Sequence, residues 1–283
     1  MSANIIDGKK LAQKIKDEIK IQIWNFNDKP GLAVVLAGDD EASKIYVKNK
    51  EKDCNEIGFY SEVHKFDNDV TEEELLNLID KLNNSDKIHG IIVQLPLPEH
   101  INEVTVLNAI IPEKDVDGFT YINAGKLFTG NNGLLPCTPA GCIELIKSTG
   151  VEIKGKDAVI VGRSNIVGKP MAILLLQEHA TITVCHSKTK NLGEITKRAD
   201  ILVVAIGKSK MIKSDMVKEN SIVIDVGMNK DENGNLCGDV DFNSVKEKVS
   251  FITPVPGGVG PMTRAMLMKN TLNAYLQKKQ GRK

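Results

Sequence analysis

The sequence predicts an α/β protein of two α/β domains, the second a Rossmann-type dinucleotide-binding domain, with a cleft between them. Three observations support this prediction. Short apolar runs alternate with helix-like segments in both halves of the chain, as in βαβ units. A glycine-bounded loop at 162–168 joins an apolar run to a helix. The length of 283 residues suits about two domains, and the 41% hydrophobic content suits sizeable cores.

Continuous apolar runs in the first half predict buried strands of a parallel sheet. These are 32–37 and 88–95, with a short candidate at 62–66. Helices are expected after capping residues such as Asp7 and Thr71, and Thr71 can form a capping box with Glu74. The expected helices are one with apolar residues at 11, 15 and 19, then 42–57, 75–82 and 105–111.

A long glycine-rich stretch, 112–141, follows and is expected to be irregular. A loop of that length is usually functional or interdomain. Thr138 and Pro139 provide a cap and a proline at the first helical position, so a helix is expected at 140–148. The domain boundary is therefore placed at Thr138, with domains of 1–138 and 139–260.

The second half repeats the strand–helix alternation. After the turn-rich segment 231–239, residues 251–252 lead into TPVPGGVGPMT and a final helix that runs to about Gln277. The expected strands are 158–161, 181–185, 201–206 and 222–226. The expected helices are 171–178, 192–198 and 214–218.

The loop between Gly162 and Gly168 resembles a phosphate-binding device. A buried strand, a glycine-bounded turn and a helix opening near Pro170 would direct loop amides and the positive helix end at an anion. The spacing fits neither GxGxxG nor the P-loop. The alternative is a plain βα turn whose glycines serve only tight packing.

The end of the next strand indicates which nucleotide this loop binds. In a Rossmann unit that strand normally ends in an acid that binds the adenosine ribose. Here it ends in Cys185-His186-Ser187-Lys188, without an acid. Arg163, Ser187 and Lys188 would attract a 2′-phosphate, so NADP is predicted over NAD. The alternative for Arg163 is a solvated charge.

Candidate chemical residues lie in the first half. Tyr46 and Lys50 are four apart on a predicted helix and share a face. Gln94 ends a buried strand, and Asp115 and Asp117 lie in the loop beyond it. Each residue alone has a structural explanation, such as packing, solvation or a turn. Together they could surround a polar heterocycle.

Composition excludes several classes of protein. Lys plus Arg and Asp plus Glu both number 37, which argues against binding to nucleic acid or a membrane surface. No apolar run is long enough to span a membrane, and the N-terminus lacks a signal-peptide core. Five cysteines without CxxC, and five histidines without HxxxH, predict no disulfide framework and no metal. A cytoplasmic protein is expected.

Seven motifs stand in order along the chain: SKIYVKNK, IIVQLPLP, PEKDVDGF, PCTPAG, VGRSNIVGKPMA, CHSKT and TPVPGGVGPMT. In series they resemble the bifunctional methylenetetrahydrofolate dehydrogenase/methenyltetrahydrofolate cyclohydrolase family over essentially the whole chain. The resemblance implies NADP-dependent oxidation of 5,10-methylenetetrahydrofolate to the 5,10-methenyl form, followed by hydrolysis to 10-formyltetrahydrofolate. It also implies a homodimer formed through the cofactor domains.

The resemblance also implies roles for individual residues. Lys50 matches the catalytic lysine, Tyr46 the tyrosine near the folate ring, Gln94 the glutamine that tunes the lysine, and Asp117 the pterin anchor. Residues 1–138 would bind folate, with the last helix, 261–283, packed back on them. Expected folate contacts also include Pro254, Gly257 and Gly258. Expected NADP contacts are Gly162, Arg163, Ser164, Val167, Gly168, Ser187, Gly207 and Gly227.

Two alternative functions remain open. One is a dehydrogenase with little or no cyclohydrolase activity, which would accumulate the methenyl product. The other is a non-catalytic nucleotide-binding or redox-sensing protein. Lys50, Gln94 and Asp117 together argue against the second, because a sensor needs no such trio.

Overall fold

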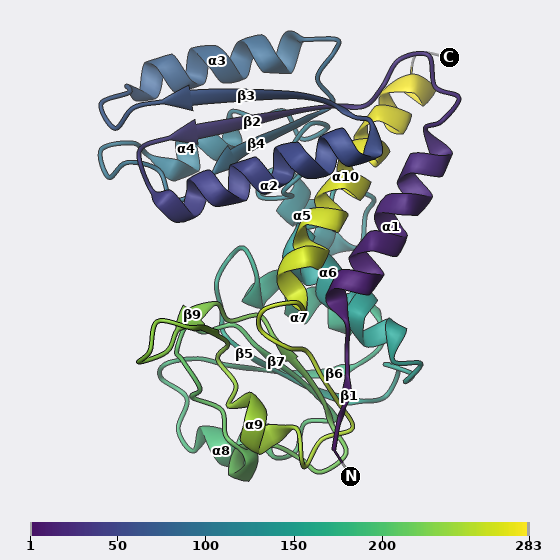
Figure 1. Cartoon of the computed structure of the whole chain (residues 1–283), viewed down its shortest axis with the longest axis vertical. Coiled ribbons are helices and arrows are strands. Elements are labelled where there is room, and N and C mark those ends of the chain that lie inside the picture. Colours follow the sequence, from purple (N-terminus) through teal and green to yellow (C-terminus); the bar gives the residue numbers. More distant parts are fainter. Residues whose placement is uncertain (1, 282–283) are drawn as a thin grey trace. The chain divides into compact units, whose positions relative to one another are not determined.

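A computed structural model describes residues 2–281. Met1 of the expected first domain and residues 282–283 of the expected last helix lie outside the described residues. The chain forms two compact units (Figure 1). The six-stranded unit contains residues 2–13 and 138–263. The three-stranded unit contains residues 14–137 and 264–281. The chain therefore passes between the units three times.

The three-stranded unit is built on a parallel sheet. Its strands are β2 (Gly31–Ala37), β3 (Tyr60–Phe66) and β4 (Gly90–Gln94), in the order β3-β2-β4. All seven residues of the central strand β2 are buried, as a sheet covered on both faces requires. Gln94 is the last residue of β4 and lies at the carboxyl edge of the sheet.

Helices α2 (Glu41–Ile57) and α3 (Glu72–Asn84) cover opposite faces of this sheet (Figure 1). Asp40 accepts a hydrogen bond from the Ser43 amide to cap α2, and Thr71 forms the expected capping box with Glu74. Alternate residues of β2 and β4 pack against α3 and α4 (Glu103–Asn108) in one hydrophobic core.

The six-stranded unit contains a parallel sheet in the order β1-β11-β8-β7-β5-β6. The order reverses between β5 and β7, so the topological switch point lies at the carboxyl ends of these two strands. The strands are β1 (Asn4–Ile5), β5 (Asp157–Val161), β6 (Thr181–Cys185), β7 (Ile201–Val204), β8 (Ile222–Asp225) and β11 (Phe251–Ile252).

The remaining elements of this unit are short except for helix α7 (Gly168–Gln177), which contacts β5 and β6. Val159, Leu202 and Val223, on three neighbouring strands, share one core with residues around the short helices. The short elements are α8 (Leu192–Thr196), η1 (Ser214–Met216), α9 (Phe242–Val245) and the hairpin of β9 (Asn229–Lys230) with β10 (Leu236–Cys237).

Three elements differ from the sequence-based expectation. Helix α5 (Tyr121–Thr129) lies within the stretch expected to be irregular, capped by the Thr120 side chain and ended by Gly130 in the left-handed conformation. Helix α6 (Cys137–Ser148) begins before Thr138. Strand β1 pairs with β11, which groups residues 2–13 with the six-stranded unit rather than with the first domain.

Helices α1 (Gly8–Gln22) and α10 (Val259–Gly281) each contribute to both units. The segment of α10 from Arg264 onward belongs to the three-stranded unit, where the Asn270 side chain donates to the carbonyl oxygens of Val116 and Leu135. In this part of α10, Tyr275 also stacks on Phe26 with ring centroids 5.3 Å apart.

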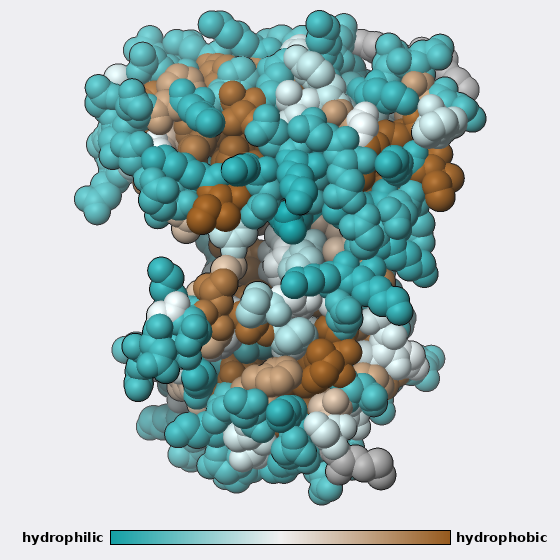
Figure 2. All heavy atoms as spheres, viewed as in Figure 1, coloured by the Kyte–Doolittle hydropathy of each residue, from teal (hydrophilic) through white to brown (hydrophobic). Residues whose placement is uncertain are grey.

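Hydrophilic residues cover most of the face drawn in Figure 2, with hydrophobic residues in scattered patches. Such scattered exposure is normal for a protein surface. No helix within 2–281 combines the length and apolar character that crossing a membrane requires.

Candidate active site

Lys50 and Gln94 meet at the carboxyl edge of the three-stranded sheet. Lys50 is 9% exposed on α2, and its Nζ donates to Oε1 of Gln94 at 3.0 Å. The Gln94 amide nitrogen donates to the Leu95 carbonyl oxygen at 2.8 Å. That second bond fixes the orientation of the amide, so its oxygen faces the lysine. The sequence predicted both residues, and the structure brings them together.

Tyr46 lies one turn before Lys50 on the same helix and is half-buried. Burial raises the pKa of its phenol, and the nearby Arg264 guanidinium partly offsets this. Arg264 forms an ion pair with Asp53 at 2.9 Å, and Asp53 also pairs with Lys16 at 3.2 Å. Because Asp53 is 4% exposed, these contacts fix α2 within its unit.

Asp117 follows β4 in the same unit. Burial raises the pKa of its carboxyl group, the positive charge of Lys50 lowers it, and Asp115 raises it. Asp115, two residues earlier, pairs with Ile91 of β4, which keeps this stretch beside the strand that ends in Gln94. The next residue, Gly118, has φ +71°, and a Cβ there would lie 2.7 Å from the Pro136 nitrogen and 2.8 Å from the Leu134 carbonyl oxygen. Only glycine suits this turn.

Asp115 has a different environment from Asp117. Its carboxylate accepts from the amides of Phe119 at 3.1 Å and Thr120 at 2.8 Å, and from the Asn123 side chain at 2.9 Å. It is 2% exposed. Asp115 therefore holds the start of α5, and of the two aspartates only Asp117 is suited to a ligand.

The sequence did not indicate two further residues near Asp117. Asn270 on α10 is 5% exposed and donates to the Val116 and Leu135 carbonyl oxygens, both at 2.8 Å. The Cys137 thiol donates to the Val116 carbonyl oxygen at 3.2 Å. Burial and the charge of Asp117 raise the pKa of this thiol well above its usual range. A single buried asparagine far along the chain gives no spacing signal.

The predicted nucleotide loop connects β5 to α7. Gly162 has φ +134°, and a Cβ on Gly168 would lie 2.3 Å from the Gly162 carbonyl oxygen, so the loop needs both glycines. The Ser164 hydroxyl accepts from the amides of Val167 at 3.2 Å and Gly168 at 3.4 Å. Among the described residues the amides of 164–166 have no backbone or side-chain acceptor. They remain available to an anion, which fits a dinucleotide phosphate.

Arg163 and Ser187 follow neighbouring strands. Val161 of β5 pairs with Cys185 of β6, and each candidate lies two residues beyond this pair. The Gly162 amide donates to the Cys185 carbonyl oxygen at 2.9 Å, which links the two strand ends. Both side chains are exposed, so a phosphate beside them would be reached from solvent.

The other predicted cofactor and substrate positions also lie at this edge of the six-stranded sheet. Gly207 has φ +64° and follows β7, and Gly227 follows β8. Beyond β11, Gly257 has φ +112°, and its carbonyl oxygen accepts from the Lys9 amide at 3.1 Å. A Cβ on Gly258 would lie 2.7 Å from the Pro254 carbonyl oxygen. These glycines would let a bound ligand approach the backbone closely.

The predicted residues thus fall into two groups, each within one unit. Tyr46, Lys50, Gln94 and Asp117 lie in the three-stranded unit, and the predicted cofactor positions with Pro254, Gly257 and Gly258 lie in the six-stranded unit. Residues 2–281 contain no group of three or more His, Cys, Asp and Glu side chains placed to bind a metal.

Two family models match this chain. The catalytic-domain model of tetrahydrofolate dehydrogenase/cyclohydrolase matches residues 6–117. The NAD(P)-binding-domain model of the same enzymes matches residues 136–279. Together they cover most of the chain.

Individual relatives are similar over nearly their full length. The chain is 56% identical over 277 residues to the bifunctional protein FolD of Acetivibrio thermocellus, covering 97% of both chains. The crystal structure of the bifunctional FolD enzyme from Campylobacter jejuni matches with a TM-score of 0.96 at 50% identity, over 98% of this chain and 100% of that one. The Trypanosoma brucei enzyme, solved with NADP cofactor and an inhibitor, matches with a TM-score of 0.94 at 38% identity, over 98% and 99%.

Proposed function

The chain belongs to the tetrahydrofolate dehydrogenase/cyclohydrolase family, and we propose which of its residues carry the two reactions of that family. It is a bifunctional enzyme that oxidises 5,10-methylenetetrahydrofolate to the 5,10-methenyl form with NADP and then hydrolyses this product to 10-formyltetrahydrofolate. The observation that carries the assignment of residues is the 3.0 Å hydrogen bond between Lys50 and Gln94 with Asp117 in the same site.

The dehydrogenase step needs positioning more than acid–base help. NADP, when bound, accepts the hydride from the methylene carbon of the substrate. The two ring nitrogens next to that carbon stabilise the resulting cation, so no side chain has to supply a proton. Tyr46 and Asp117 orient the folate ring in our proposal, and the glycine-bounded loop 162–168 holds the cofactor.

The cyclohydrolase step does need proton transfer. Water adds to the methenyl carbon, and a proton must move to a ring nitrogen as the C–N bond opens. Lys50 is the group we assign to this transfer, since the residue is only 9% exposed and its Nζ is oriented by the Gln94 oxygen. In our proposal the Lys50 amine, held by the Gln94 oxygen, exchanges this proton with the water and the ring nitrogen.

One assay tests this function as a whole. Purified protein is mixed with 5,10-methylenetetrahydrofolate and NADP, with NAD in a parallel reaction, and methenyltetrahydrofolate is followed by its absorbance. We expect reduction of NADP with little build-up of the methenyl compound, because the second activity removes it. Build-up of the methenyl compound would instead favour a dehydrogenase with little cyclohydrolase activity. No reduction of either cofactor would support a non-catalytic protein.

Arg163 is predicted to select NADP over NAD. Replacing Arg163 with Ala should raise the KM for NADP by about tenfold or more, because a charge-assisted hydrogen bond to the 2′-phosphate is lost, and should change the KM for NAD little. Lys213→Ala is the matched control, since it removes an exposed cation of the same unit that lies outside the loop 162–168. Equal effects of Arg163→Ala on both cofactors would refute the assignment.

We also propose a homodimer formed through the six-stranded unit. Strand β6 is at one edge of the sheet, and Val184 on it is 38% exposed and Leu176 on α7 is 52% exposed. An uncovered strand edge next to apolar side chains is suited to a partner. We expect the Val184→Lys/Leu176→Lys variant to sediment as a monomer where the unaltered protein sediments as a dimer. Leu236→Lys, at a 48% exposed position on β10, should leave the mass unchanged.

A cytoplasmic location is proposed for this activity. All five cysteines are free thiols and buried, which suits a reducing compartment. Cell fractionation that placed the protein with a secreted or membrane fraction would contradict it.

A further inference from the structure

Asp239 is a buried carboxylate that the two reactions do not use. It is 0% exposed and lies between the β9–β10 hairpin and α9. Its Oδ2 accepts from the amides of Ile206 at 2.7 Å and Gly207 at 3.1 Å. Its Oδ1 accepts from the Lys208 amide at 2.7 Å and from the Asn229 side chain at 2.9 Å. Three consecutive amides of the loop after β7 therefore point at one carboxylate.

A second buried carboxylate holds Asp239 in place. Asp225, the last residue of β8, is 3% exposed and accepts from the amides of Asp239 and Val240, both at 2.9 Å. A Cβ on Gly227 would lie 2.3 Å from Cγ of Asp239, and a Cβ on Gly238 would lie 1.8 Å from Asp225 Oδ2. Both glycines are needed for the two carboxylates to fit. The two carboxylates, the amides that they accept from and the two glycines therefore form one interlocked arrangement.

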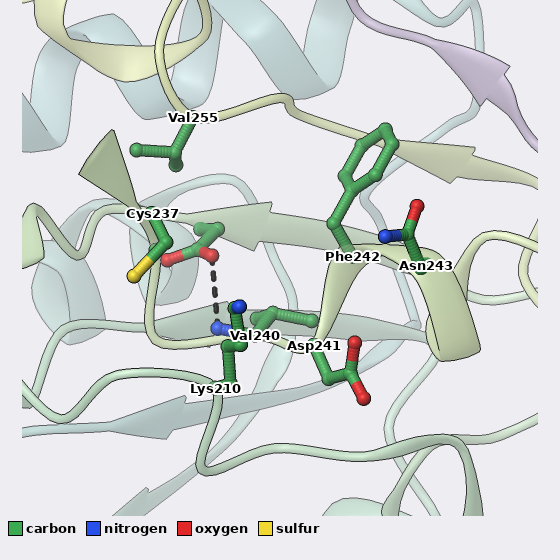
Figure 3. Close-up of a pocket in the computed structure, with 9 residues that line it drawn as sticks. Lys210, Cys237, Val240, Asp241, Phe242, Asn243 and Val255 are labelled. Carbon is green, nitrogen blue, oxygen red and sulfur yellow. Dashed lines mark hydrogen bonds between the residues drawn. The ribbon is translucent and has the colours of Figure 1, made fainter. Parts of the chain in front are cut away.

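These carboxylates do not themselves form a ligand site. Within 2–281, neither lies within ion-pair distance of a lysine or arginine. The cavity beside Asp225, between Lys210, Phe242 and Val255, has a volume of about 80 Å³ (Figure 3). Pockets that bind drug-sized ligands have volumes of about 300–1,000 Å³, so this cavity is too small for a dinucleotide. The Asp225 carboxylate accepts from the Val240 amide at 2.9 Å and is therefore already hydrogen-bonded within the protein. The effect of Asp239 on a ligand must pass through the loop 206–208.

The topology shows which part of a dinucleotide this loop faces. The two halves of a dinucleotide lie on opposite sides of the switch point between β5 and β7, with the pyrophosphate at the loop after β5. Ser187 and the adenosine side follow β6. The loop 206–208 follows β7 and is therefore on the nicotinamide side.

The hydrogen bonds to Asp239 decide what this loop can offer a ligand. Its amides at 206, 207 and 208 are occupied, and the Lys208 carbonyl oxygen accepts from the Met211 amide at 3.4 Å, so the backbone groups left are the carbonyl oxygens of Ile206 and Gly207. Carbonyl oxygens accept hydrogen bonds and repel phosphate, but they match the NH₂ donor of a nicotinamide carboxamide. We propose that Asp239 is a positioning residue for cofactor binding, which leaves the backbone of the loop 206–208 with only acceptors for the carboxamide of NADP. This inference rests on the NADP-dependent function stated above.

The first test measures cofactor binding in two matched variants. In Asp239→Asn an NH₂ group faces two of the donors in either orientation, so at least two hydrogen bonds are lost. We expect the Kd for NADP, measured by calorimetry, to rise about tenfold or more. Asp241→Asn is the control, because the Asp241 side chain forms no capping hydrogen bond at α9, and its Kd should stay within about twofold.

A second measurement distinguishes a role of Asp239 in positioning the cofactor from a general loss of structure in the variant. Cyclohydrolase activity is assayed from methenyltetrahydrofolate without NADP, and Asp239→Asn should retain it within about twofold, because Lys50, Gln94 and Asp117 lie in the other unit. An unchanged Kd for NADP, or an equal loss of cyclohydrolase activity, would overturn the proposal. If the unaltered protein neither bound NADP nor hydrolysed methenyltetrahydrofolate, the proposed function itself would have failed instead.

The 3-acetylpyridine analogue of NADP tests the carboxamide directly, because a methyl group replaces its NH₂ donor. The unaltered protein should bind the analogue about tenfold more weakly than NADP, and Asp239→Asn should show a smaller ratio, since the acceptor surface is already disturbed. Equal ratios in the two proteins would contradict the acceptor role.

A measurement on the unaltered protein covers the case in which Asp239→Asn does not fold. Amide exchange without NADP should be about tenfold or more slower at 206–208 than at 164–166, where the amides have no acceptor. Equal exchange in the two loops would refute the arrangement.

Discussion

Replacing Lys50 with Met is expected to remove cyclohydrolase activity and to leave a measurable part of the dehydrogenase activity. Methionine keeps most of the length of the side chain and loses the amine that moves the proton. General acid–base groups contribute roughly 10²–10⁴-fold to rate, so hydrolysis should fall by that factor. Hydride transfer needs no proton from Lys50, so it should suffer only from altered positioning.

The measurement uses two separate assays. Hydrolysis is followed as loss of methenyltetrahydrofolate absorbance, and dehydrogenation as appearance of NADPH. Because hydrolysis has stopped, the methenyl compound should accumulate in the Lys50→Met reaction. Lys48→Met is the matched control, because Lys48 is exposed on the same helix. Normal hydrolysis by Lys50→Met would rule out the role of Lys50.

Replacing Asp117 with Ala is expected to lower both activities together. The carboxylate anchors the pterin in our proposal, and a hydrogen bond to a charged group contributes about 1.5–3 kcal/mol, or roughly 10- to 150-fold in kcat/KM. The loss should appear in the KM for folate in both assays. Glu113→Ala, at an exposed position in the same stretch, is the control. A normal folate KM in Asp117→Ala would show that the anchor lies elsewhere.

This variant should fold. Burial raises the pKa of Asp117, so the folded protein binds a proton there more tightly than the unfolded chain does. Stability from this group is then greatest at low pH and is lost as pH rises from the ordinary aspartate range through the raised pKa. Above the raised pKa the ionised carboxylate opposes folding, so its removal should not lower the Tm measured there. As the pH is lowered, protonation of Asp117 removes the anchoring charge and should raise the KM for folate. Because the pKa of Asp117 is raised, this increase should begin at a higher pH than it would for an ordinary aspartate.

The sequence predicted the parts of the fold that depend on local patterns. Buried runs such as 32–37 became the central strand of a sheet, and the spacing of Tyr46 and Lys50 placed both on one helix. Gln94 was predicted at a strand end, where parallel sheets place ligand groups. Helix α5 was missed because Gly125 and Gly130 in that stretch resemble turn signals.

Contacts between distant residues were not predictable. The pairing of β1 with β11 joins residues about 250 positions apart, and a two-residue strand has no periodicity of its own. Asn270 and Asp239 act on loops more than 30 positions away, through hydrogen bonds that depend on the finished fold. Sequence patterns report local geometry, and these roles are set by tertiary structure.

The pairing of β1 with β11 also affects how the chain folds as it is made. The six-stranded unit needs residues 4–5 and 251–252 together, and the three-stranded unit needs 264–281 of α10. Synthesis proceeds at about 5–20 residues per second and usually lets N-terminal domains fold first. Here neither unit can be completed until the ribosome has delivered almost the whole protein. A nascent chain stalled near residue 240 therefore has its first strand unpaired, and chaperones that bind exposed segments should retain it until release.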